Sequence, residues 1–270
     1  MIDLANDQLT VTLLDPESDR DRFGTRYCTG GYIFQIADRK VGDLLSGPTY
    51  PEDFNTFDGQ GIPDSFNQQP LRDQDSPGSE ALIVGVGRCN LEKDEVLAFD
   101  EWTVSAESDH VLFSTTQTFQ SFELELKRRV SLHGRTIRSS TTLSNPGKRI
   151  PLRWFPHPFY PHPDTDELCR FNIAVSFPEN EGYALSESGF IRRSQSPWES
   201  GYFQALDHDA TQPLVVLQKH PGIGLVGATT SYVPGFFPIW GNANTFSWEP
   251  YLERTVPAGQ TMTWWIDYEF

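Results

Sequence analysis

The chain has 270 residues, of which 13% are aromatic, and its formal net charge at pH 7 is −16. This excess of acid argues against nucleic-acid partners and against anionic membrane surfaces. It suits a soluble protein with a neutral ligand, and it disfavours a strongly anionic substrate.

Short apolar or alternating segments follow one another along the chain in the pattern of β-strands. The 20 prolines and 21 glycines add frequent turns. A hairpin is expected where two alternating segments meet at His133-Gly134. The predicted strands cover residues 9–14, 32–36, 81–86, 102–106, 110–118, 122–132, 136–143, 168–175, 214–218, 224–230, 237–240 and 262–270. No composition break divides the chain, so residues 1–270 are expected to form a single all-β domain of stacked antiparallel sheets.

Two proline-rich segments interrupt the strands. Residues 46–80 are rich in Gly, Pro, Asp, Asn and Gln and predict a long ordered loop near a functional site, because loops of this length in compact domains are usually functional. Residues 151–163 contain five prolines and are predicted to be neither a helix nor a central strand.

The three cysteines, Cys28, Cys89 and Cys169, are far apart and match no metal-binding spacing. They are expected to be reduced thiols in a cytoplasmic protein. The first residues show no basic segment followed by an apolar run, and no apolar run approaches the length of a membrane span. Neither a signal peptide nor a membrane anchor is therefore expected.

Near the C-terminus, Glu249 stands in the aromatic-rich segment 236–251. Burial of a carboxylate is costly and raises its pKa, which makes such a Glu a candidate general base. The alternative is a Glu at a strand end that is solvated or ion-paired beside a core cluster.

His157 lies between Pro156 and Pro158, with aromatic residues on both sides. A histidine on such a stiff segment is a candidate for proton transfer, and the alternative is a packed loop histidine that binds a carbonyl group. With His162 and Asp164 it could form a metal site, but the irregular spacing disfavours one.

Other candidate residues could bind a substrate. Arg88 follows Gly85-Val86-Gly87 at the end of an apolar strand, where it could enter a cleft or form an ordinary ion pair. Trp154, Phe237 and Trp240 could pack in the core, or could stack on the apolar face of a sugar ring. No Ser/His/Asp or Cys/His nucleophile motif is visible.

The order of these features resembles the aldose 1-epimerase (galactose mutarotase-like) superfamily over roughly residues 30–270. The likeness rests on motifs that recur in the same order, of which the histidine and glutamate motifs are the most specific. They are Gly61-Ile62-Pro63-Asp64-Ser65-Phe66, Val84-Gly85-Val86-Gly87-Arg88, His157-Pro158-Phe159-Tyr160, Trp240-Gly241 and Glu249-Pro250.

This resemblance implies a β-supersandwich with a sugar cleft, and an isomerase that interconverts the α and β anomers of an aldose without any cofactor. It makes Glu249 the general base and His157 the general acid, facing each other across a cleft wide enough for a pyranose ring. It makes Arg88 the arginine that contacts the substrate. Asp207 is the candidate for the aspartate that binds sugar hydroxyls.

One position departs from the superfamily pattern, because Val84 stands where a sugar-binding histidine is expected. Two alternative functions therefore stay open. A mutarotase for sugar phosphates would need several Arg or Lys side chains at the cleft, with Arg88 and Arg153 as candidates. A carbohydrate-binding protein without turnover could share the fold.

Overall fold

The computed structural model describes residues 1–75, 78–194 and 201–270, and nearly all of its regular structure is antiparallel β-sheet. The helical element in the described residues is a single 3-10 turn, η1 (Arg20–Arg22). The first sheet has the strand order β1-β2-β3-β4. Its strands are β1 (Ile2–Ala5), β2 (Leu9–Leu13), β3 (Ile33–Asp38) and β4 (Gly42–Asp43).

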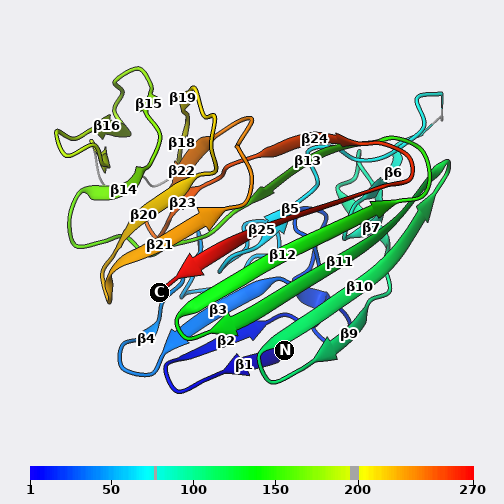
Figure 1. Cartoon of the computed structure of the whole chain (residues 1–270), viewed down its shortest axis with the longest axis horizontal. Coiled ribbons are helices and arrows are strands. Elements are labelled where there is room, and N and C mark those ends of the chain that lie inside the picture. Colours follow the sequence, from blue (N-terminus) through cyan, green and yellow to red (C-terminus); the bar gives the residue numbers. More distant parts are fainter. Residues whose placement is uncertain (76–77, 195–200) are drawn as a thin grey trace.

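A ten-stranded sheet is the largest element, with the order β16-β17-β14-β20-β21-β25-β12-β11-β10-β9. Figure 1 shows its long strands β10, β11, β12 and β25 lying side by side. The strands of this sheet are β9 (Thr103–Ala106), β10 (His110–Phe119), β11 (Phe122–His133), β12 (Thr136–Asn145), β14 (Glu167–Phe171), β16 (Tyr183–Leu185), β17 (Ile191–Arg193), β20 (Val215–His220), β21 (Gly224–Thr230) and β25 (Gln260–Glu269).

Four smaller sheets complete the described structure, with the orders β24-β13-β5, β18-β22-β23, β6-β7-β8 and β15-β19. Their strands are β5 (Asp64–Ser65), β6 (Glu80–Ile83), β7 (Gly87–Asn90), β8 (Glu95–Phe99), β13 (Ile150–Pro156), β15 (Val175–Ser176), β18 (Tyr202–Ala205), β19 (Asp207–His208), β22 (Pro238–Gly241), β23 (Phe246–Trp248) and β24 (Leu252–Val256). The all-β class and the antiparallel pairing predicted from the sequence are confirmed.

The main hydrophobic core joins several of these sheets. On β11, buried residues alternate with more exposed ones, so one face of the strand turns inward, as an amphipathic strand requires. Leu126 of β11 packs in the same cluster as Leu13 of β2, Trp154 of β13 and Trp264 of β25. The core therefore joins the ten-stranded sheet to the sheets β1-β2-β3-β4 and β24-β13-β5.

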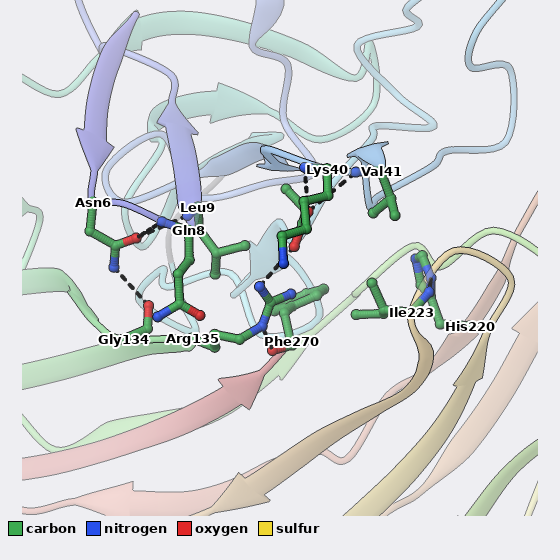
Figure 2. A network of polar contacts seen from close by, with 11 residues as sticks. Asn6, Gln8, Leu9, Lys40, Val41, Gly134, Arg135, His220, Ile223 and Phe270 are labelled. Carbon is green, nitrogen blue, oxygen red and sulfur yellow. Dashed lines mark hydrogen bonds and ion pairs between the residues drawn. The ribbon is translucent and has the colours of Figure 1, made fainter.

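A polar network ties the first sheet to the hairpin between β11 and β12 and to the C-terminus (Figure 2). The side-chain amide of Asn6 donates to the carbonyl of Gly134 over 2.7 Å. Arg135 forms an ion pair of 2.7 Å with Asp38, which is 7% exposed, and its Nε donates to the carbonyl oxygen of Phe270. These contacts fasten the first sheet to the C-terminal end of the chain.

The prediction that segment 151–163 forms no central strand is wrong, because β13 is the middle strand of the sheet β24-β13-β5. Its two prolines lie near opposite ends of the strand. Pro151 pairs only with β24, and Pro156 pairs only with β5. Each proline has an unpaired side, where the missing N–H costs no ladder hydrogen bond, so a strand is tolerated here.

Candidate functional site

His157 and Glu249 line a common pocket of about 450 Å³. Its wall combines aromatic rings with a small set of polar groups. The other lining residues are Arg26, Pro48, Phe57, Asp58, Asn67, Gln68, Phe155, Phe159, Phe203, Trp240 and Tyr251. Five of these come from segment 46–80, so the long loop predicted to lie near a site forms one side of this pocket.

The backbone of the segment 61–63 holds His157 in place. The N–H of His157 donates to the carbonyl of Pro63, and the N–H of Phe159 donates to the carbonyl of Gly61, both over 2.8 Å. Gly61 has a φ of +78°, and a Cβ there would collide with the carbonyl oxygens of Ile33 and Phe34. Only glycine fits at this position, which explains why a Gly-Ile-Pro sequence supports the histidine.

Glu249 directly follows β23, the last strand of the sheet β18-β22-β23. Its N–H donates to the carbonyl of Pro238 on the neighbouring strand β22, over 2.9 Å. The side chain is nearly removed from water, with 6% of the residue exposed. The paired strands β22 and β23 therefore place the buried carboxyl group of Glu249 at the pocket.

The two side chains are in contact. Nε2 of His157 lies 3.4 Å from Oε1 of Glu249. On the opposite side of the ring, Nδ1 lies 2.9 Å from Oγ of Ser247, which is completely buried. Phe159 stacks on the imidazole with 4.3 Å between ring centroids. The expectation of a gap for a pyranose ring between His157 and Glu249 is therefore wrong, and a ligand must bind on the pocket side of both groups.

Burial controls the protonation of this pair. It raises the pKa of Glu249 to about 8, and the cation of Arg26 acts in the opposite direction. Burial also lowers the pKa of His157 well below its ordinary value, and Arg26 adds to this effect. Desolvation penalises the charged form of each group, so a protonated carboxyl and a neutral imidazole are favoured at neutral pH.

Arg26 was not identified from the sequence. Its guanidinium group lies 4.9 Å from the ring centre of Phe57 and 5.1 Å from that of Tyr27, and Nη1 donates to the carbonyl of Phe57 over 3.1 Å. No ion pair to Arg26 exists within residues 1–75, 78–194 and 201–270. The pocket thus holds an arginine whose charge is free to meet a ligand.

Two other predicted substrate-binding residues, Arg88 and Asp207, lie outside the pocket lining. Arg88 is exposed on β7, with its Nε 3.8 Å from Glu80. Asp207 is exposed on β19 and borders a separate surface hollow. Neither side chain lines the pocket of His157 and Glu249.

Of the three aromatic candidates, Trp240 lines the pocket, and the other two lie in the core. Trp154 packs against Trp264 with 5.5 Å between ring centroids, and Phe237 packs against Phe171 with 4.7 Å. The aromatic ring that β13 contributes to the pocket is Phe155, because neighbouring residues of a strand point to opposite faces.

Among the described residues, no second histidine lines the pocket. Val84 is buried in the main core. His162 lies outside the pocket lining, and its Nε2 is 2.6 Å from the carbonyl oxygen of Asn242. The proton chemistry that this wall can supply therefore rests on one imidazole and one buried carboxyl group.

A larger hollow of about 630 Å³ lies elsewhere and is lined largely by charged residues, among them Asp15, Glu17, Arg20 and Glu101. It also contains Asp100, whose pKa burial raises to about 7. The described part of the chain contains no cluster of His, Cys, Asp or Glu arranged to hold a metal ion, and no helix long and apolar enough to span a membrane.

Among the solved structures that are similar to this chain over nearly its whole length are three described as galactose mutarotase related or galactose mutarotase-like. A galactose mutarotase related enzyme from Lactobacillus acidophilus has a TM-score of 0.65 at 9% sequence identity, covering 99% of this chain and 96% of that one. Galactose mutarotase-like proteins from Lactobacillus casei and Clostridium acetobutylicum have TM-scores of 0.57 and 0.55, both at 12% identity. They cover 100% and 98% of this chain, and 99% and 93% of their own chains.

No family model matches the sequence, and no curated protein matches it either. At such low identities the structural similarity establishes a shared fold. The β-supersandwich expected from the sequence resemblance, of the galactose mutarotase-like type, is therefore confirmed. What the site does has to be argued from its own geometry.

Proposed function

We propose that this protein is an aldose mutarotase, which interconverts the α and β anomers of a free sugar. The observation that carries the proposal is the contact between His157 and Glu249, two buried groups 3.4 Å apart on the wall of one aromatic pocket. Paired titratable groups with opposite pKa shifts in a pocket are typical of proton-transfer sites.

Mutarotation suits two groups that lie next to each other. The anomeric hydroxyl oxygen O1 and the ring oxygen O5 are both bonded to C1, so the atoms that lose and gain a proton are close together. Glu249 takes the proton of O1, and His157 faces O5 as a hydrogen-bond donor when the C1–O5 bond breaks. Rotation about the C1–C2 bond and closure on the other face give the other anomer.

The rest of the pocket supports a sugar ligand. Its volume of about 450 Å³ lies in the range of small-molecule sites, roughly 300–1,000 Å³. Trp240 offers an aromatic surface to the apolar face of a sugar ring. Arg26, Asn67 and Asp58 supply donors and acceptors for hydroxyl groups. Arg26 thereby takes the role of substrate-contacting arginine that the sequence resemblance assigned to Arg88.

A free sugar is favoured over a sugar phosphate. Arg26 is the one cationic side chain in the described lining of the pocket, and the chain as a whole carries a net charge of −16. A phosphate group is usually bound by several charge-assisted hydrogen bonds. Arg153, the other candidate for a phosphate site, is paired with Glu253 over 3.0 Å and lies outside the pocket lining.

Anomer exchange in a panel of free aldoses and their 6-phosphates tests this proposal. The rate is followed by polarimetry on freshly dissolved single anomers, with Glu249→Gln as the inactive control. We expect the wild-type protein to accelerate exchange for at least one free aldose. A wild-type rate no faster than the variant's across the panel would leave only a binding function, and acceleration confined to the phosphates would move the substrate to that class.

A further inference from the structure

The side chain of Ser247 contacts His157 on the side of the imidazole ring opposite Glu249. Ser247 lies in β23 and is completely buried, and its Oγ is 2.9 Å from Nδ1 of His157. Within the described residues this is the one hydrogen bond of the Ser247 hydroxyl. Because Ser247 is out of reach of a substrate, it is no nucleophile, and its hydroxyl acts on the imidazole alone.

The direction of this hydrogen bond follows from the burial of the hydroxyl group. If Nδ1 carried the proton, the O–H of Ser247 would be buried without an acceptor, which is unfavourable. If the hydroxyl donates to Nδ1, both groups are satisfied. The neutral imidazole then carries its proton on Nε2, the nitrogen 3.4 Å from Glu249.

The surroundings of the ring keep it neutral. The charged and titratable groups that contact His157 or act on its pKa are Glu249, Arg26 and Tyr27, whose ring meets the imidazole edge-on at 6.2 Å. Asp58 and Tyr251 also line the pocket. Burial raises the pKa of Tyr27 well above its ordinary value, so the phenol brings no negative charge. Arg26 disfavours a second positive charge beside it.

We propose that Ser247 is a positioning residue, which holds His157 as a neutral hydrogen-bond donor at Nε2, and that Glu249 alone carries the proton between the two oxygens of the anomeric carbon. This inference rests on the proposed mutarotase function and assigns its proton route.

Opening of the sugar ring requires no change in the protonation of His157. The carboxylate of Glu249 accepts the proton of O1, the O1 electron pair forms the C1=O1 double bond, and the C1–O5 electron pair moves to O5. The Nε2–H of His157 donates a hydrogen bond to the negative charge that develops on O5, as a preorganised donor does in an oxyanion hole. The protonated Glu249 then returns the same proton to O5, and closure reverses each event.

Histidine NMR tests the placement of the proton independently of any activity. The full-length protein is labelled with ¹⁵N-histidine, and the His157 signals are assigned with a His157→Gln variant. We expect the neutral tautomer with the proton on Nε2 from pH 6 to 9, with and without saturating sugar. A proton on Nδ1, or an imidazolium ion in the sugar complex, would overturn the proposal.

Variants at Ser247 test the positioning role. In Ser247→Ala we expect the NMR signals of a tautomer mixture and a kcat about tenfold lower, the loss of roughly one hydrogen bond, with KM little changed. Ser247→Thr keeps the hydroxyl and should restore both. The matched control is Ser131→Ala, which removes a buried serine hydroxyl on β11, outside the pocket. An unchanged tautomer and kcat in Ser247→Ala would contradict the role.

Two substitutions of His157 test the proton route. A glutamine amide can donate a hydrogen bond but cannot act as an acid, so His157→Gln should keep at least about a tenth of kcat, whereas His157→Ala should lose about a hundredfold. Equal inactivity of both variants would show that His157 gives up its own proton. If the wild-type protein exchanges no anomers at all, the mutarotase function and the proton route both fail, while the NMR result still decides the role of Ser247.

Discussion

Arg128 forms a buried two-point ion pair with Asp64 in the middle of the molecule. The distance from Nη1 to Oδ1 is 2.6 Å, and the two side chains are 1% and 8% exposed. Asp64 directly follows Pro63, whose carbonyl oxygen holds the backbone N–H of His157. Through this ion pair, the long strand β11 anchors the segment whose backbone supports the functional histidine.

We expect Arg128→Met to destabilise the protein by about 3–5 kcal/mol, because the substitution leaves the buried carboxylate of Asp64 without its partner. The double variant Arg128→Met/Asp64→Leu should recover most of this loss, since no buried charge remains. Denaturant unfolding of the two variants and the wild type measures the difference. Equal stability of the single and double variants would contradict the account.

The rate of anomer exchange should rise with pH and level off above a midpoint near pH 8. Glu249 must be ionised to accept a proton, and burial holds its pKa at about 8. Arg26→Met should move the midpoint to higher pH, because the cation of Arg26 favours the carboxylate. Arg20→Met, outside the pocket, serves as the control. A rate that falls through this pH range would mean that the protonated carboxyl is the active form.

Because burial raises the pKa of Glu249, this residue lowers the stability of the folded protein as pH rises. Below pH 4.5 the carboxyl group is protonated in both the folded and the unfolded state. Between pH 4.5 and about 8 the unfolded state loses its proton while the folded state keeps it, so the free energy of unfolding falls as pH rises.

Glu249→Gln lacks this titration, so the variant should become more stable than the wild type by roughly 3–5 kcal/mol at pH 8, and by almost nothing at pH 4. Urea unfolding of both proteins across this range measures the gap. A gap that stays constant with pH would show that the Glu249 pKa is not raised by folding.

Trp240 is the aromatic surface that we expect a sugar to contact. Trp240→Ala should raise KM about tenfold, which corresponds to roughly 1.4 kcal/mol of lost stacking, with a smaller effect on kcat. Trp265→Ala is a suitable control, because Trp265 stacks under Arg138, with 4.1 Å from the guanidinium carbon to the ring centre, and lies outside the pocket. Steady-state kinetics on the best sugar of the panel provides the comparison.

The sequence was informative where local chemistry is unusual. Glu249 stands in an aromatic segment and His157 between two prolines, and the structure brings them into contact. The alternating strands and the hairpin at His133-Gly134 also follow from local patterns, and both are present. These features depend on residues close together in the chain, which is why they could be predicted.

The rest of the pocket depends on long-range packing. Trp154 and Phe155 are neighbours on β13, and only the register of the sheet decides which of them faces the core. Arg26 and Asn67 reach the pocket from irregular segments, whose path no local pattern determines. The position of Arg88 in a motif predicts a contact with substrate, but the pairing of β7 with β6 and β8 leaves its side chain exposed.

The most direct test of the central claim compares Glu249→Gln with Glu253→Gln. Glu253 lies on β24, is about two-fifths exposed, and pairs with Arg153 outside the pocket lining. Anomer exchange of the preferred free aldose is measured by NMR at pH 8.5 with equal concentrations of each protein. We predict a rate at least about a hundredfold lower for Glu249→Gln and a wild-type rate for Glu253→Gln. A wild-type rate in Glu249→Gln would contradict the proposed function.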